Sequence, residues 1–206
     1  MSAEPPRRPA GSGNDCFGTA EACVGMTILT TKRLRLEPFD DAHLDGLNAM
    51  NSDPEVMKYL GPPESREQTL EAIRRVKNRW IEFGFSWWSF VDRASGEVVG
   101  AGCIQHLRRS GQSPDPACPL EVGWRLRRDR WHQGLATEAA VTMADFAFQT
   151  LKTDVLYAVC HPDNAASASV MKRLAMRYKG LEIWYDKTLA TYETTSSEWQ
   201  RRRTGP

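Results

Sequence analysis

The sequence predicts a mixed α+β domain built around one central sheet. Its 206 residues suit a single domain of ordinary size. Segments with the period-2 pattern of strands and segments with the 3.6-residue period of helices follow one another along the chain. Their order is a strand, helices, a hairpin, a strand, a helix, a strand, a helix and two closing strands, without an internal repeat. Such an order is typical of α+β domains.

The predicted domain runs from residue 26 to residue 199, between two tails. Residues 1–25 are rich in Gly, Pro, Ser and Ala and hold few large apolar side chains. They cannot bury enough surface to offset their chain entropy, so we expect a disordered tail. Residues 200–206 contain three consecutive arginines and are expected to form a solvated basic tail.

The first half of the domain is predicted to hold one strand, three helices and a hairpin. The longest helix begins at Ser65, which forms a capping box with Gln68, and ends at Gly84. The hairpin is indicated by two aromatic or β-branched segments around a short polar turn. In order, the predicted elements are a half-buried strand over 27–39, short helices after 40–41 and 53–54, a helix over 65–83, and a hairpin of 85–91 and 98–107.

The second half alternates strands and helices after a loop over 108–119 that contains one glycine and three prolines. Its first helix is amphipathic, because Ala140, Met143, Ala144 and Ala147 fall on one face. In order, the predicted elements are a strand over 120–126, a helix over 137–151, a strand over 155–160, a helix over 164–176, and closing strands over 181–185 and 189–195.

Composition excludes several classes of protein. The net charge of +1 argues against a nucleic-acid binder that acts through bulk electrostatics. No apolar run approaches the ~20 residues that span a bilayer, and no secretory signal is visible, so we expect a cytoplasmic protein without a membrane partner. The five cysteines lack C-x-x-C spacing and the four histidines are scattered, so neither disulfides nor a metal site is expected.

The most informative stretch is the junction between the strand over 120–126 and the helix over 137–151. The strand leads into a polar turn with Gly134, and the turn leads directly into an alanine-rich helix. This arrangement directs free backbone N–H groups and the positive end of a helix dipole toward one point. Gly134 and the small Ala136 permit close approach of a ligand, and Thr137 offers a hydroxyl at the helix start.

Four arginines surround this turn and form a local positive patch: Arg125, Arg127, Arg128 and Arg130. A multiply anionic ligand is the natural partner of such a patch. An ordinary strand–loop–helix junction with solvated arginines explains the same stretch equally well. Neither a Walker loop nor a dinucleotide-binding fingerprint is present.

Three stretches resemble, in the right order, the motifs of the GNAT superfamily of N-acetyltransferases, and of its RimJ/RimL-type branch in particular. Thr31-x-Arg33-Leu34-x-Leu36 resembles the opening strand of that branch. The central stretch, Glu121-x-Gly123-Trp124 followed by Trp131-His132-Gln133-Gly134-Leu135-Ala136-Thr137-Glu138-Ala139, resembles its acetyl-CoA motif. Pro162-x-Asn164-x-x-Ser167 resembles its segment after the next strand. The resemblance covers residues 26–199.

The resemblance implies a largely antiparallel mixed sheet with helices on both faces and one parallel pair of strands, 120–126 and 155–160, that splay apart. Acetyl-CoA would lie in the split: strand backbone would pair with the pantetheine amides, and the turn amides would hold the pyrophosphate. The positions that the resemblance assigns to cofactor binding are Trp124, Leu126, Trp131, His132, Gln133, Gly134, Leu135, Ala136, Thr137 and Asn164.

The chain departs from the family pattern at two glycine positions. His132 stands where the family usually has glycine, so Gly134 is the only glycine within the turn. Ala175-Met176 occupies the place of the Gly-Phe that usually ends the late helix. Because the contacts of the turn are mainly backbone contacts, cofactor binding is expected to survive these differences.

The implied chemistry is direct attack of an amine on the thioester, which needs a base for the ammonium proton and an acid for the departing thiolate. Glu121 is our candidate base; an edge carboxylate in a salt bridge with an arginine is the equal alternative. His161 and then His106 are weaker candidates. Ser167 is the candidate acid, although a first-turn residue that satisfies a backbone N–H is as good an explanation. Tyr178 is the competing donor.

The sequence therefore predicts an acetyl-CoA-dependent N-acetyltransferase, monomeric or homodimeric, acting on a primary amine of a small molecule or a protein N-terminus. A catalytically silent acyl-CoA-binding or sensor domain is the alternative, and a nucleotide-binding module is disfavoured by the missing Walker lysine. Acceptor specificity is expected in the loops over 53–66 and 108–119 and in the last strands, and the family alone does not identify the acceptor.

Overall fold

The computed structural model describes residues 26–111 and 113–204, so the tail expected at 1–25 lies outside the described residues. The strands are β1 (Leu29–Thr30), β2 (Leu34–Pro38), β3 (Trp87–Asp92), β4 (Val98–His106), β5 (Leu120–Leu126), β6 (Val155–Cys160), β7 (Arg177–Trp184) and β8 (Lys187–Thr195). The helices are α1 (Leu44–Asn51), α2 (Pro54–Met57), α3 (Arg66–Phe83), α4 (Leu135–Gln149), α5 (Ala165–Arg173) and α6 (Ser196–Thr204), with short 3₁₀ turns at Asp41–His43 and Arg128–Arg130.

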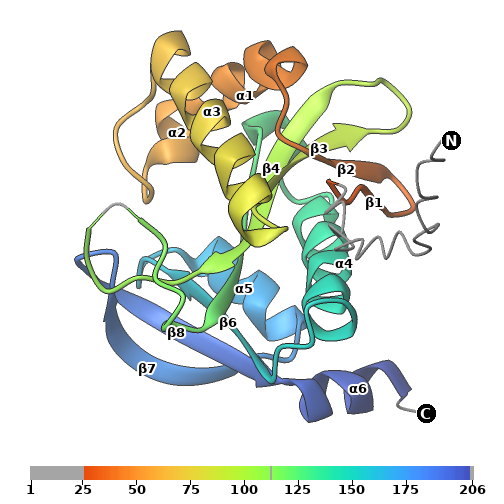
Figure 1. Cartoon of the computed structure of the whole chain (residues 1–206), viewed down its shortest axis with the longest axis vertical. Helices are drawn as coiled ribbons and strands as arrows, with labels where there is room; N and C mark the ends of the chain where they lie inside the picture. The colour runs from red at the N-terminus through yellow and green to blue at the C-terminus, as the bar shows by residue number, and fades with distance from the viewer. Residues whose placement is uncertain (1–25, 112, 205–206) are drawn as a thin grey trace, which may run out of the picture.

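The strands form one sheet in the order β1-β2-β3-β4-β5-β6-β8-β7. Every neighbouring pair is antiparallel except β5 and β6, which are parallel. Figure 1 shows the sheet passing from β1 and β2 through β4 to the long β7–β8 hairpin. The predicted α+β class, with one largely antiparallel mixed sheet, is confirmed.

The sheet is nearly divided between β5 and β6. These strands pair at only two positions, Leu120 with Leu156 and Glu121 with Tyr157, whereas β4 and β5 pair along seven. Beyond Glu121 the two parallel strands diverge, so residues 122–126 have no register partner on β6. The splayed pair that the resemblance implied is therefore present.

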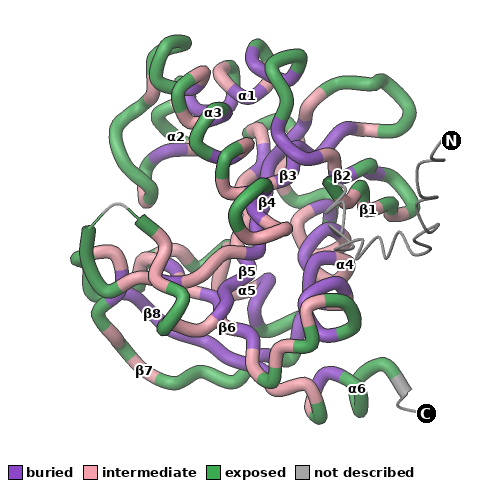
Figure 2. The backbone as a smooth tube through the Cα atoms, in the orientation of Figure 1, coloured by how far each residue is buried: buried purple, intermediate pink, exposed green. Residues whose placement is uncertain are grey.

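Helices cover both faces of the sheet around β4. A Cβ at Gly102 would lie 2.8 Å from Cε of Met143, so this side of β4 faces α4. The neighbouring Cys103 points to the other side, because side chains alternate along a strand, and it interacts electrostatically with Arg79 of α3. In Figure 2 the buried residues run along α4 and the central strands, while β7 is largely exposed.

The structure confirms the predicted first or last residue of several elements. The strands over 120–126 and 155–160 have the expected bounds. Ser65 and Gln68 form the expected capping box, and α3 ends at Gly84 in the left-handed conformation with φ of 74°. Boundaries of this kind can be predicted because they depend on the type of one or two residues at the end of the element.

Several element boundaries differ from the sequence prediction; β7, for example, begins at Arg177, four residues before the expected strand. The strand expected over 27–39 is divided, because the backbone turns after Thr31, whose N–H donates to the carbonyl of Leu34 at 2.9 Å. Residues 200–204 belong to helix α6. Trp199 anchors α6: it is buried, and its Nε1 donates to Oδ1 of Asp145 at 2.8 Å.

Among the described residues, no helix is long and apolar enough to cross a membrane.

Candidate functional site

The unpaired edge of β5 is the first component of the site. Leu120, Val122 and Leu126 of β5 are buried, which fixes the strand against the core. Trp124 is half-buried on the stretch that has left β6. The carbonyl of Leu126 already accepts from Nε1 of Trp131 at 2.9 Å, so the indole fixes the exit from the strand. A carbonyl has a second lone pair, and the edge can therefore still pair with amides of an extended ligand.

The turn before α4 is the second component. Gly134 is the N-cap residue of α4, has a φ of 76°, and provides no side chain to cap the helix. The first intrahelical bond of α4 is that from Glu138 N to Gly134 O at 3.0 Å. The N–H groups of the first turn, at residues 135–137, therefore lack intrahelical acceptors and can bind an anion.

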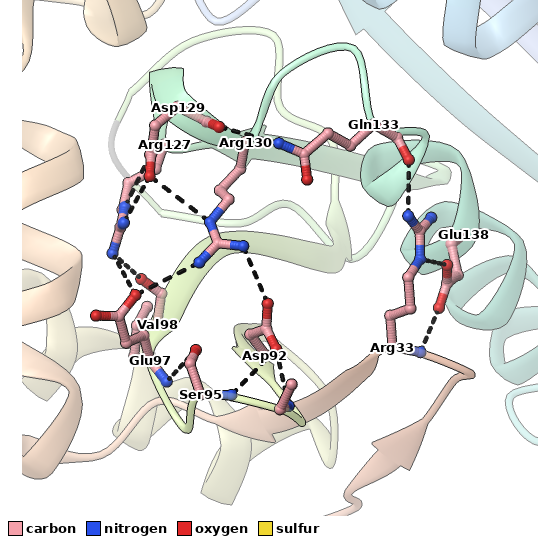
Figure 3. Close-up of polar contacts among 11 residues, drawn as sticks. Arg33, Asp92, Ser95, Glu97, Val98, Arg127, Asp129, Arg130, Gln133 and Glu138 are labelled. Carbon is pink, nitrogen blue, oxygen red and sulfur yellow. Dashed lines mark hydrogen bonds and ion pairs between the residues drawn. The ribbon is translucent and has the colours of Figure 1, made fainter.

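An ion pair between α4 and Arg33, in the turn that joins β1 to β2, holds this turn in place (Figure 3). Nη1 of Arg33 donates to the carbonyl of Gln133 at 2.8 Å, and its Nε pairs with Glu138 at 2.7 Å. Glu138 also accepts from the hydroxyl of Thr31 at 2.6 Å and from the backbone N–H of Arg33 at 2.8 Å. The connection between β1 and β2 thus fixes the turn from about a hundred residues away.

The arginine patch predicted around the turn is largely neutralised. Figure 3 shows Arg127 bonded to Asp129, and Arg130 placed between Asp92 and Glu97. Arg127 pairs with Asp129 at 2.7 Å, and Arg130 pairs with Asp92 at 3.2 Å. Arg128 lies 3.9 Å from Asp53. The prediction of a free positive patch was therefore wrong for these three residues, and the backbone N–H groups and helix dipole remain as the anion-binding elements.

The ionised Glu138 makes the stability of the protein depend on pH. Burial acts to raise the pKa of Glu138, but the hydrogen bonds from Thr31 and Arg33 outweigh it and hold that pKa below its ordinary 4.5. A lowered folded-state pKa contributes stability that is present above pH 4.5 and is lost as the pH falls through the folded-state value. We expect Glu138→Gln to lower the free energy of unfolding by about 1–2 kcal/mol at neutral pH.

Urea unfolding of wild type and Glu138→Gln at neutral pH and below pH 4.5 measures this effect. The difference in the free energy of unfolding should shrink at the lower pH, because wild type then loses its own carboxylate. Glu71→Gln, which removes an exposed carboxylate of α3, is the matched control. An equal deficit at both pH values would contradict the assignment of the stability to the ionised carboxylate.

Both departures from the family's glycines lie at left-handed positions. His132 has a φ of 60° and Ala175 a φ of 57°. The turn and the end of α5 therefore keep a backbone conformation that suits glycine, although neither position carries one. Histidine is among the residues that tolerate this conformation better than β-branched residues do.

His132→Val is accordingly expected to lower the free energy of unfolding by about 1–2 kcal/mol. His132→Gly is expected to remain within about 1 kcal/mol of wild type, because relief of the positive φ is offset by a more flexible unfolded chain. Thermal unfolding of the two variants measures the difference. A valine variant as stable as the glycine variant would show that the turn relaxes away from the positive φ.

Glu121 lies at the base of the split and is only 5% exposed. Gln105 Nε2 donates to Glu121 Oε1 at 2.8 Å, and the hydroxyl of Tyr185 donates to the same oxygen. Gln105 is itself oriented by Trp87, whose Nε1 donates to Gln105 Oε1 at 3.0 Å. No described residue forms an ion pair with Glu121, so the salt-bridge alternative does not describe it. Burial raises the pKa of Glu121 above its ordinary value, although both hydrogen bonds act to lower it.

Tyr185 is a site residue that the sequence reading missed. It lies in the two-residue turn between β7 and β8, where Tyr185 and Asp186 have φ values of 57° and 58°. Their backbone N–H groups donate to the carbonyls of Arg108 and Arg109 at 2.9 and 3.0 Å. Burial raises the pKa of Tyr185, and the neighbouring Glu121 raises it further. An aromatic residue in a hairpin turn, where glycine or asparagine is usual, was the available signal.

The segment after β6 holds the other predicted residues. Asn164 is the N-cap of α5, and its Oδ1 accepts from the backbone N–H of Ser167 at 3.1 Å. Asn164 thus has a capping role, while the half-buried hydroxyl of Ser167 remains in the first turn of α5. His161 stacks on Tyr59 with ring centroids 5.1 Å apart. Tyr178 lies on the outer strand β7, 52% exposed, with β8 between it and β6, so it does not reach the split.

Nδ1 of His106 lies 2.9 Å from the carbonyl of Cys118, so this nitrogen contacts the loop before β5. A cavity of about 470 Å³ lies beside the other candidate histidine, His161. It is lined by Lys58, Tyr59, Gly61, His161, Lys187 and Thr188. Three of these residues belong to the loop expected to carry acceptor specificity. Among the described residues, no group of three His, Cys, Asp or Glu side chains is placed to hold a metal ion.

Comparisons with known proteins agree with this geometry. A family model described as "Acetyltransferase (GNAT) domain" matches residues 33–177. The chain is 31% identical over 173 residues to the uncharacterized protein YkkB of Bacillus subtilis, covering 82% of this chain and 96% of that protein. The structure of an acetyltransferase from Agrobacterium tumefaciens is similar with a TM-score of 0.70 and 26% identity, over 82% of this chain and 94% of that chain.

A solved complex of the ribosomal L7/L12 alpha-N-protein acetyltransferase RimL with coenzyme A is also similar, with a TM-score of 0.65. The match covers 82% of this chain and 98% of that chain. At 16% identity, this likeness is one of fold alone.

Proposed function

Because this chain belongs to the GNAT acetyltransferase family and is an N-acetyltransferase, we propose that it transfers the acetyl group of acetyl-CoA to a primary amine by direct attack on the thioester. The observation that carries this proposal is the split at β5 and β6, with the uncapped start of α4 beside it. The first offers unpaired strand backbone and the second offers free N–H groups, which are the two features that an extended, phosphate-bearing cosubstrate requires.

Acetyl-CoA supplies the activated acetyl group when bound. Backbone groups of Trp124 and Leu126 pair with its pantetheine arm, and the N–H groups of the turn over 131–137 bind its pyrophosphate. Asn164 fixes the first turn of α5 beside the same site through its contact with Ser167. These assignments rest on the resemblance of the motifs and on the backbone geometry of β5 and the turn.

Glu121 takes the ammonium proton of the acceptor, through water, and the amine nitrogen then forms its bond to the acetyl carbonyl carbon as the carbon–sulfur bond breaks. A raised pKa suits this role, since a base closer to neutrality accepts a proton more readily. A backbone N–H of β5 stabilises the charge on the carbonyl oxygen. Ser167 donates the proton that the departing thiolate receives, and its hydroxyl is restored by the second proton, which the nitrogen loses as the amide forms.

We assign the chain to the RimJ/RimL-type branch on its motifs, and the cytoplasm as its location. The three cysteines among the described residues, Cys103, Cys118 and Cys160, are unpaired thiols, which supports a reducing compartment. A silent acyl-CoA-binding domain is the alternative function. The buried Glu121, held by two donors at the base of the split, favours the enzyme, since ligand binding alone does not need it.

The test is release of free thiol from acetyl-CoA in the presence of amines of different classes, together with thermal unfolding in acetyl-CoA and in ATP. The proposal expects thiol release with at least one amine class, and stabilisation by acetyl-CoA but not by ATP. Stabilisation without thiol release for any amine would support the silent binding domain. Equal stabilisation by ATP would point to a general phosphate site.

A further inference from the structure

Arg125 is an unsatisfied cation on the same side of β5 as the candidate base. Its Nε is buried without a hydrogen-bond partner, and its guanidinium forms no hydrogen bond or ion pair with any residue that the structure describes. The guanidinium lies over the ring of Trp87, with 5.0 Å between Cζ and the ring centroid. Burial lowers the pKa of Arg125, so its present surroundings solvate the charge poorly. A buried donor in this state is typically completed by a ligand or water.

The neighbouring sheet positions leave room for this side chain. Arg125 pairs with Ala101 on β4, and Ala101 pairs with Ser89 on β3, so the two nearest positions in its row hold small residues. The next position, Glu37 on β2, is paired with Arg35. The hydroxyl of Ser89 is itself buried without a partner. Arg125 and Trp87 are thus the large side chains at this part of the face, and the planar guanidinium rests on the indole as a preformed recognition surface.

The charges that face Arg125 do not neutralise it. Glu64 acts on it only through space, because Glu64 Oε2 accepts from Asn51 at 2.9 Å and lies 3.4 Å from the hydroxyl of Thr69. Two further guanidinium groups, of Arg79 and Arg108, interact with each other unfavourably near the buried Cys103 and Tyr185. Arg79 and Arg108 therefore add positive charge near Glu121, whereas Arg127 and Arg130 are paired with carboxylates.

We propose that Arg125 binds a negatively charged group of the acceptor, so that the enzyme prefers amines that also carry a carboxylate or a phosphate. The inference rests on the proposed function, since it concerns the acceptor of that reaction. Arg125 is a specificity residue here and takes no part in the acetyl transfer. Carboxylates and phosphates are the groups that match the bidentate geometry of a guanidinium.

The register also predicts the shape of the acceptor. Glu121 and Arg125 are four residues apart on one face of β5, which places their Cα atoms about 13 Å apart. An acceptor whose amine lies near Glu121 and whose anion lies near Arg125 must therefore separate the two groups by several bonds. Short α-amino acids are expected to be poorer acceptors than amines with the anion farther along the chain.

The experiment compares acetylation of ω-amino carboxylates of increasing length, their carboxamide counterparts and aminoalkyl phosphates. Wild type is expected to favour an anionic acceptor over its neutral counterpart by roughly 10- to 100-fold in kcat/KM. Arg125→Gln should abolish that preference mainly through a higher KM for the anionic acceptor, and Arg125→Lys should retain part of it. The carboxylate and phosphate arms decide which anion is preferred.

Arg74→Gln, which removes an exposed arginine of α3 that pairs with Glu71 at 3.7 Å, is the matched control and should leave the preference intact. Equal turnover of neutral and anionic acceptors by wild type, or an unchanged preference in Arg125→Gln, would overturn the inference. If Arg125→Gln fails to fold, a preference in Arg125→Lys equal to that of wild type would likewise overturn it. Absence of thiol release with every amine would instead overturn the proposed function.

Discussion

Glu121→Gln is expected to lower kcat for acetyl transfer by roughly 10²- to 10⁴-fold, the contribution that a general base typically makes. The amide keeps the shape of the carboxyl and can still accept from Gln105 or Tyr185, but it cannot take the ammonium proton. The affinity for acetyl-CoA should stay unchanged, because Glu121 lies where β5 and β6 still pair and the proposed cofactor contacts begin at Trp124. Thiol-release kinetics and acetyl-CoA titration separate the two effects.

The ionisation of Glu121 also makes stability and activity depend on pH, which gives a second test of its role. Burial raises its folded-state pKa above the ordinary 4.5, so the folded protein holds this proton more tightly than the unfolded chain. Stability from this group is therefore full below pH 4.5 and is lost as the pH rises through the folded-state value. Relative to wild type, the glutamine variant should gain stability between acidic and neutral pH, while wild-type activity should rise through a pKa above 4.5.

Two variants control this experiment. Glu82→Gln removes an exposed carboxylate at the end of α3 and should retain wild-type kcat. Tyr185→Phe removes one donor to Glu121 and should raise the pKa seen in the activity profile, with a smaller loss of kcat. Full activity in Glu121→Gln would remove Glu121 from the chemistry and direct attention to His161.

Gly102→Ala is expected to lower the free energy of unfolding by about 2–3 kcal/mol and the Tm by roughly 5–10 °C. The new Cβ would lie 2.5 Å from Cζ of Phe90 and 2.8 Å from Cε of Met143 on α4. It would also lie 2.7 Å from the carbonyl oxygen of Gly123, which a side-chain rotation cannot relieve. Strand β5 must shift to make room, and the shift moves the strand that carries Glu121, so acetyl transfer should fall as well.

Gly61→Ala is the matched control for stability. Nothing lies within 4 Å of a Cβ built at Gly61, and its φ is not in the left-handed region. Its Tm should therefore remain within a few degrees of wild type. A Gly102→Ala variant as stable as Gly61→Ala would show that β4 and β5 separate easily and that their spacing does not depend on this glycine.

The parts of the fold that the sequence predicted correctly depend on local patterns. Strands 120–126 and 155–160 are bounded apolar segments, and Ser65 and Gly84 are residues whose chemistry begins and ends a helix. The division of the first strand follows from one contact, between Thr31 and Leu34, that no periodicity reports. The helical end of the chain depends on Trp199 reaching Asp145, more than fifty residues away.

The same distinction applies to the candidate site. Glu121 and the turn at Gly134 could be proposed as site residues from the sequence because the motif that contains them is made of adjacent residues. The pairing of Arg130 with Asp92, and the approach of Tyr185 to Glu121, join distant segments, and charge counts along the sequence cannot show such partners. Arg125 differs from Arg127 and Arg130 because it has no carboxylate partner among the described residues, and only the structure shows this difference.

The narrow junction between β5 and β6 has a consequence for the cohesion of the whole domain. Only two paired positions join the strands β1–β5 to the strands β6–β8 within the sheet. Cooperative unfolding units tend to separate where few backbone hydrogen bonds connect them. A ligand that fills the split would contact both halves of the sheet. We therefore expect local unfolding of β6–β8 to be rarer while a ligand is bound. Occupancy of the proposed acetyl-CoA site is therefore expected to lengthen the survival of the protein under proteolysis.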